Sequence, residues 1–502
     1  MLPFSFQSID RSLIIDDKVM AEYTGGTIEA DHLCVLVHGL WGNPIHMASV
    51  AKALRAKHPA DKVYILCVKR NSGSFTYDGI ELGGERVCLE IEEELRAIES
   101  RGGKIKKLSV VGYSLGGLVA RYAIGLLYAK GVLDGLECMN FTAFASPFIG
   151  VRTPLTGGAN HLWNVLGART LSTSGRQLFT IDKFRNTGRP LLAVLADRNS
   201  IFMQGLAKFR RRTLYANVVN DRSAVYYTTG IAKTDPYTDL SKVRVHYAKG
   251  YEDVVLDRTH PVDPIPPHAW KKDTLSEKVN KWLYRVPFIL ALVVLVPLAL
   301  VAYFINSLIQ TVRSYKRIAL HEKGQAGINI DEYRMPVLIN ELRGAVEDAY
   351  EELSSTQQQQ YLGLSDDDGD SSSDSDNGSS SSCSASGSAT EAWPLLESKG
   401  NNDDNDNNDK GATSRFARRA SDRNILRRER KQSQPGQPTL ALAPCQFEMI
   451  SALDSLGWHK YPVWIHRNRH SHASIIVRTE KEIFSEGYIV LKHWLNEEFL
   501  VE

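Results

Sequence analysis

Short, largely apolar runs alternate with helical patterns over the first half of the chain. The runs have the length of strands that are buried on both faces of a parallel sheet. They are residues 33–37, 63–68, 108–111 and 140–145, with two further predicted strands at 191–196 and 213–219. Helical patterns lie between them at residues 47–58, 83–100 and 118–128. This alternation predicts an α/β fold with a doubly wound, mostly parallel sheet.

The α/β core is predicted to consist of two parts separated by segments of different composition. The first part is residues 1–270 and the second is residues 444–502. Residues 151–190 combine bulky apolar and basic side chains without a strand period, which predicts a helical cap or, as an alternative, an ordinary pair of surface helices. The second part is expected to contain a strand or short helix at 447–453 and a closing amphipathic helix at 479–495.

A low-complexity insert occupies residues 355–440. It passes from glutamine, serine, aspartate and asparagine runs into a basic stretch between Lys410 and Lys431. It lacks the apolar residues needed to offset ordering entropy, so we expect disorder. Ser421 and the serines at 371–375 lie in patterns typical of kinase targets, which would make kinases partners of this insert. Because such patterns are common by chance, a solvated tether is the favoured interpretation.

Residues 286–309 form an apolar segment that could enter a membrane. Its first 20 residues carry no charge, and 20 helical residues measure about 30 Å, the thickness of a bilayer core. Basic residues flank both ends, so the positive-inside bias gives no orientation. Pro297 near the middle favours a bent hairpin. A straight span and a long buried core helix are the alternatives.

Net charge and cysteine usage argue against a nucleic-acid-binding protein and against a disulfide-rich protein. The formal net charge of +2 gives no reason to expect a nucleic-acid partner, and no cofactor or metal is expected. The six cysteines are scattered without a C-x-x-C pair, which indicates reduced thiols in a cytosol-facing protein rather than a disulfide framework.

A nucleophile motif follows the predicted strand at 108–111. In Gly112-Tyr113-Ser114-Leu115-Gly116, glycines two positions before and after the serine let a strand turn sharply into a helix. Such a turn lifts the hydroxyl of Ser114 out of the sheet. The pattern alone can occur by chance, but the strand before it and the helix after it strengthen the prediction of Ser114 as a nucleophile.

A serine nucleophile needs a base and a group that orients the base. With this kind of turn the chain order is serine, acid, histidine. Asp221 follows the predicted strand 213–219 and is the candidate acid. His472 directly precedes an apolar segment and is the first choice for the base, with His470 as the runner-up. Three other histidines are interpreted as loop or surface residues: His38, His268 and His466.

The negatively charged intermediate of acyl transfer needs two hydrogen-bond donors. The N–H of Leu115 is expected to supply one of them through the turn. The second is expected from the glycine-rich loop after the strand 33–37, at the N–H of Leu40 or Trp41.

Five stretches of the chain, taken together, resemble a known family. They are Leu36-Val37-His38-Gly39-Leu40-Trp41-Gly42-Asn43, residues 77–86, residues 112–117, residues 145–150 and residues 470–478. They are similar to the fungal branch of the putative serine esterase lipases, over residues 30–260 and 445–500. The resemblance implies an α/β-hydrolase fold and hydrolysis of acyl esters of glycerolipids. Known members include a lipid-droplet phospholipase and a monoacylglycerol lipase. Tyr113 stands where histidine is common in the family.

The apolar segment constrains the membrane topology. Ser114 and Asp221 precede it and His472 follows it, so a single crossing would put the three on opposite sides of a membrane. Either the segment is a hairpin in one leaflet or the assignment of the three residues is wrong. A hairpin is favoured, and it suits a lipid-droplet monolayer or the cytosolic face of the endoplasmic reticulum.

The sequence therefore favours a membrane- or droplet-associated serine lipase or phospholipase that acts on phospholipids or monoacylglycerols. An acyltransferase that uses the same acyl-enzyme is one alternative. A catalytically inactive membrane scaffold with this fold is the other.

Overall fold

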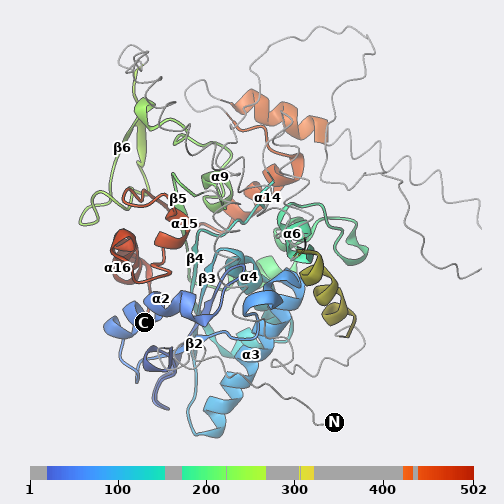
Figure 1. Cartoon of the computed structure of the whole chain (residues 1–502), viewed down its shortest axis with the longest axis vertical. Helices are drawn as coiled ribbons and strands as arrows, with labels where there is room; N and C mark the ends of the chain where they lie inside the picture. Colours follow the sequence, from blue (N-terminus) through green and yellow to red (C-terminus); the bar gives the residue numbers. More distant parts are fainter. Residues whose placement is uncertain are drawn as a thin grey trace, which may run out of the picture.

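A six-stranded parallel sheet organises the chain in the computed structural model (Figure 1). The strand order is β2-β1-β3-β4-β5-β8, and each neighbouring pair is parallel. The bounds are β1 His32–Val37, β2 Val63–Cys67, β3 Lys107–Tyr113, β4 Glu137–Phe144, β5 Arg211–Asn217 and β8 His459–Val463. The structure describes residues 20–152, 172–221, 223–266, 305, 307–320, 422–433 and 439–502.

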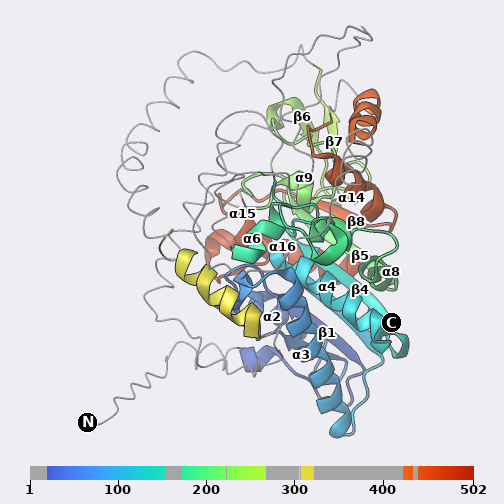
Figure 2. The same ribbon diagram turned by 90° about the vertical axis from the view of Figure 1, so that its right-hand side faces the viewer.

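Helices cover both faces of this sheet (Figure 2). The longer ones are α2 Ala48–Lys57, α3 Ile80–Ser100, α4 Leu115–Ala129, α14 Pro444–Asp454 and α16 Glu486–His493. Shorter ones are α6 Ser172–Leu178, α7 Leu191–Leu195, α8 Ile201–Ala207, α9 Tyr226–Thr229 and α15 Ser471–Ser474. Single 3-10 turns are η1 Pro44–Met47, η2 Gly73–Tyr77, η3 Val132–Gly135, η4 Arg185–Thr187, η5 Leu240–Lys242 and η8 Glu482–Phe484. A separate antiparallel pair is β6 Val243–Val245 with β7 Val262–Pro264.

The apolar side chains of the strands alternate between two buried cores. In β1, Leu33 and Val35 contribute to the core under α3 and α4, whereas Cys34 and Leu36 contribute to the core under α2 and α16. This two-sided burial explains why the strands are almost continuously apolar. The predicted α/β class with a parallel sheet is confirmed, and the arrangement fits an α/β-hydrolase.

The C-terminal part of the chain completes the sheet. Strand β8 pairs with β5 in parallel, from Thr213 opposite His459 to Asn217 opposite Val463. Residues that are more than 200 positions apart thus lie side by side, and the loop after β8 leads to α15, which carries His472.

Two predicted elements differ from the structure. Residues 191–196 were expected as a strand but form α7, which begins directly after Pro190. A five-residue apolar run does not distinguish a strand from a buried helix, and the Leu-Leu-Ala-Val-Leu sequence of α7 is rich in good helix formers. The helix expected over 479–495 is interrupted: η8 is followed by α16, and a π-helical turn continues over Trp494–Glu498.

Part of the insert that was expected to be disordered is helical. Residues 422–432 form a helix in which Ile425 and Leu426 pack against the core under α3 and α4. Glu429 is buried and pairs with Lys233 over 2.9 Å. Two adjacent apolar residues within the basic stretch, together with this ion pair, attach the helix to the core. The rest of the insert before Thr439 lies outside the described residues.

Most of the apolar segment 286–309 lies outside the described residues, as does the first half of the predicted cap, 153–171. Within the described ranges, no helix is long and apolar enough to cross a membrane. The cysteine interpretation holds for four residues, which are free and buried, but Cys445 is disulfide-bonded. The four are Cys34, Cys67, Cys88 and Cys138.

Buried His493 predicts acid sensitivity of the fold. Burial lowers the pKa of His493 to about 4, from an ordinary value near 6.5, and its Nδ1 lies 2.8 Å from Tyr215 Oη. The unfolded state therefore binds more protons between about pH 6.5 and pH 4, so this group destabilises the fold progressively as the pH falls through that window. We expect the free energy of unfolding to fall there by about 2–3 kcal/mol more in the wild type than in His493→Gln. Urea titrations at several pH values would measure it, and parallel curves for the two proteins would contradict it.

Candidate active site

Ser114 lies in a strained turn between β3 and α4. Its φ of 54° and ψ of −128° lie outside the regions that ordinary residues favour. The turn is held because the N–H of Ser114 donates to the carbonyl of Phe144 over 2.9 Å, and Ser146 Oγ donates to the Ser114 carbonyl over 2.8 Å. The turn thus presents the Ser114 hydroxyl at the carboxyl end of the sheet.

The two glycines of the motif are required by close approach of the backbone. A Cβ at Gly116 would lie 2.3 Å from the carbonyl oxygen of Val37, and a Cβ at Gly112 would lie 2.4 Å from the Cα of Gly117. No side chain fits at such distances. The spacing around Ser114 is therefore a packing requirement of strands β1 and β3 against the start of α4.

The structure brings together the three side chains predicted from the sequence. Ser114 Oγ lies 2.9 Å from His472 Nε2, and His472 Nδ1 lies 2.9 Å from Asp221 Oδ2. His472 and Asp221 are 4% and 6% exposed, whereas Ser114 is only half-buried. The hydroxyl is thus accessible from outside while the histidine and the carboxylate are shielded.

Asp221 is oriented by the loop after β5. Asn217 Nδ2 donates to Asp221 Oδ2 and the N–H of Ala224 donates to Oδ1, each over 2.8 Å. With His472 as a third partner, both carboxylate oxygens are engaged. This arrangement leaves the carboxylate little freedom to turn away from the imidazole.

Tyr113 positions the histidine, a contact that the sequence did not predict. Its hydroxyl donates to the carbonyl of His472 over 3.0 Å, and the two rings lie 5.2 Å apart. Ser471 Oγ donates to the carbonyl of Val219 over 2.8 Å and fixes α15 from its other side. In the sequence, Tyr113 stood out only as a departure from the family that the chain resembles.

The glycine-rich loop after β1 lies against the nucleophile. A Cβ on Gly39 would lie 2.8 Å from Ser114 Cβ, so only glycine allows this approach. Of the two predicted donors of the loop, the N–H of Trp41 donates to Thr76 Oγ1 over 3.0 Å and is occupied. Leu40 is thus the remaining candidate from this loop, next to Leu115 at the start of α4.

The other histidines lie elsewhere. His38 is buried at the base of the loop, with Nδ1 3.1 Å from the Gly39 carbonyl. His470 caps α15, and its N–H donates to Asn468. His268 lies outside the described residues.

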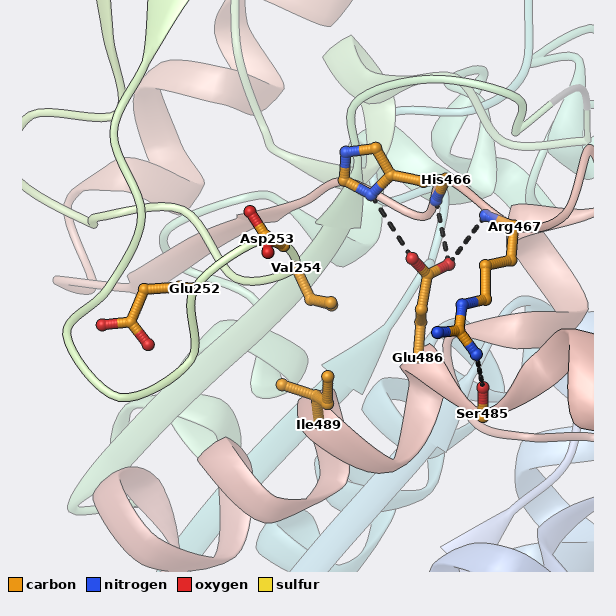
Figure 3. A pocket seen from close by; sticks show the side chains of 8 residues that line it. All are labelled: Glu252, Asp253, Val254, His466, Arg467, Ser485, Glu486 and Ile489. Carbon is orange, nitrogen blue, oxygen red and sulfur yellow. Dashed lines mark hydrogen bonds and ion pairs between the residues drawn. The ribbon is translucent and has the colours of Figure 1, made fainter.

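His466 lies in a pocket of about 530 Å³ away from Ser114 (Figure 3). Its Nδ1 lies 3.4 Å from Glu486, which also accepts hydrogen bonds from the N–H groups of His466 and Arg467. In the part of the chain that the structure describes, no group of three or more His, Cys, Asp or Glu side chains could hold a metal ion.

Comparison with known proteins agrees with this arrangement. Residues 27–235 match the model of the family described as putative serine esterase (DUF676). The matched span contains Ser114, Asp221 and the loop at Leu40, while His472 lies beyond it.

Curated relatives that match the chain are named as putative lipases. The putative lipases YDL109C and ROG1 of Saccharomyces cerevisiae are each 28% identical to the chain, over 48% and 42% of it. These matches cover 36% and 30% of the two yeast proteins, so the chain spans about a third of the length of the curated relatives it matches. A solved lipase-esterase related protein from Clostridium acetobutylicum aligns over 27% of this chain and 48% of its own. The identity is 14% and the TM-score is 0.19, so we draw no conclusion from this similarity.

Proposed function

We propose that the protein is a serine lipase or phospholipase that hydrolyses acyl esters of glycerolipids at a cytosol-facing membrane or lipid-droplet surface. The observation that carries the chemistry is the continuous hydrogen-bond chain from Ser114 through His472 to Asp221, on a turn that exposes the serine. The match of residues 27–235 to a serine esterase family model and the lipase names of the yeast relatives support it.

The geometry supports a two-step reaction. Ser114 Oγ attacks the ester carbonyl while His472 Nε2 takes its proton, and Asp221 stabilises the resulting imidazolium. The N–H groups of Leu115 and Leu40 are the proposed donors to the oxyanion. When the C–O bond of the ester breaks, His472 returns the proton to the leaving alcohol and the acyl group stays on Ser114. Water then attacks the acyl-enzyme with His472 as base; as the bond between Ser114 Oγ and the acyl carbon breaks, His472 returns the proton to Oγ and the fatty acid leaves.

Labelling with a fluorophosphonate probe tests the proposed nucleophile. We expect the wild type to form a covalent adduct and Ser114→Ala to form none, because the activated serine is the attacking group. Gel fluorescence and peptide mass spectrometry would measure the adduct. An unlabelled but folded wild type would instead support a catalytically inactive scaffold.

Unlabelled wild type and Ser114→Ala should then be given phospholipids and mono-, di- and triacylglycerols in mixed micelles. Release of free fatty acid by the wild type and not by Ser114→Ala is the expected result. Transfer of the acyl group to an added alcohol, without free fatty acid, would identify an acyltransferase. The lipid that is cleaved fastest identifies the head group that the enzyme prefers.

A further inference from the structure

The helix at residues 307–320 has its polar and apolar faces reversed relative to an ordinary surface helix. Its buried side chains are polar or charged: Ser307, Gln310, Ser314 and Arg317. Its exposed side chains include the large apolar ones, Leu308 at 66%, Tyr315 at 54%, Val312 at 47% and Ile309 at 45%. Surface helices normally bury the apolar stripe, so the reversal calls for a specific cause.

The polar face is held by a buried ionic cluster. Arg317 Nη2 lies 2.5 Å from Asp78 Oδ1, and the same carboxylate pairs with Arg86 over 2.6 Å. Arg317 also donates to the carbonyl of Ser74, and both guanidinium groups lie 4.9 Å from the ring centre of Phe75. These contacts fix the rotation of the helix on η2 and the start of α3, and they leave its large apolar side chains exposed. Figure 2 shows this helix in yellow.

The outward face has the composition of a helix that lies in a lipid interface. Leu308, Ile309, Val312 and Tyr315 extend along one side, with Ile305, 57% exposed, preceding them. Lys316 is exposed on the same helix, where a lysine places its ammonium group among phosphate groups while its stem covers apolar surface. Each large apolar side chain that leaves water on docking stabilises the bound state.

The chain that leads into this helix favours lipid over a protein partner. No charged residue occurs between Arg285 and Arg313, so an uncharged stretch runs directly into the exposed apolar face. We propose that the exposed face of residues 305–320, defined by Ile305, Leu308, Ile309, Val312 and Tyr315, docks on a phospholipid surface.

The docked helix would lie close to the candidate active site. Helix 307–320 rests on η2, whose Ser74 carbonyl accepts from Arg317. Two residues further on, Thr76 Oγ1 accepts the N–H of Trp41 in the loop beside Ser114. This relation to the site rests on the proposed function: docking by this face would present lipid next to the nucleophile. The docking itself does not depend on any chemistry at Ser114.

Photocrosslinking distinguishes docking by this face from general membrane binding. Full-length protein with Ser114→Ala and p-benzoylphenylalanine at position 308 or 312 would be irradiated with vesicles of phosphatidylcholine that contain a labelled acyl chain. We expect lipid adducts from both positions. The matched controls are Ile28 and Ile483, which are 56% and 49% exposed and lie on other elements. Benzoylphenylalanine there is expected to give several-fold less adduct.

Three results would overturn the proposal. They are equal adducts at all four positions, protein adducts in place of lipid adducts at positions 308 and 312, and no flotation of the protein with the vesicles. Hydrolysis of a soluble short-chain ester by protein with Ser114 intact tests the proposed function separately. An active enzyme without adducts at 308 and 312 would refute only the docking surface, whereas adducts without esterase activity would refute only the proposed function.

Discussion

Replacing His472 with alanine is expected to lower kcat/KM for a soluble acyl ester by a factor on the order of 10⁴. His472 Nε2 lies 2.9 Å from Ser114 Oγ, so the variant leaves the hydroxyl without a base within hydrogen-bond reach. The effect is expected mainly in kcat, because the imidazole acts on the proton of Ser114 and not on the substrate's binding. Steady-state kinetics with a p-nitrophenyl ester would measure it.

His470 offers a matched control, since it lies two residues away on the same turn of chain. Its N–H donates to Asn468 and its carbonyl accepts from Ser474, so its place in the turn depends on the backbone. We expect His470→Ala to change kcat/KM by less than about tenfold. If the two variants lost activity equally, or if only His470→Ala did, the assignment of His472 as the base would be wrong.

The sequence predicted best those parts of the fold in which one local steric requirement determines the backbone conformation. The glycines around Ser114 have no steric alternative, so the strand, turn and helix at 107–129 follow from the pattern. The apolar run at 191–195 had no such requirement, and its helix is decided by packing within the core. Local pattern therefore failed where tertiary contacts decide the conformation.

In the candidate site, too, local patterns were predictable and long-range contacts were not. Ser114, Asp221 and His472 could be proposed from motif and chain order, because each follows a predicted strand or precedes an apolar segment. The hydrogen bond from Tyr113 to the carbonyl of His472, and the occupation of the Trp41 N–H by Thr76, join residues that are 359 and 35 positions apart. No local pattern encodes such contacts.

The sequence did not predict the orientation of the helix at 307–320, for a further reason. Its apolar residues continue the uncharged stretch that begins at 286, so the sequence favoured a single hydrophobic segment through Ile309. The rotation of the helix is decided by Arg317, whose partner Asp78 is 239 residues away. A buried ion pair can thus invert the orientation that hydrophobic pattern alone would predict.

Replacing Asp78 with asparagine is expected to lower the free energy of unfolding by on the order of 3–5 kcal/mol. Asp78, Arg86 and Arg317 are 2%, 6% and 5% exposed, so the variant leaves two guanidinium groups buried without their shared carboxylate. Water cannot replace that carboxylate at full strength in so enclosed a place. Urea unfolding at neutral pH, followed by circular dichroism, would measure the loss.

Glu81→Gln is the matched control, because Glu81 lies three residues further along the chain and pairs with Arg185 at the surface. The side chains of that pair are 31% and 61% exposed, so we expect a loss of no more than about 1 kcal/mol. If Asp78→Asn cost no more than Glu81→Gln, the carboxylate would not be what holds Arg317. The Arg317–Asp78 pair would then not explain why the helix at 307–320 turns its apolar side outward.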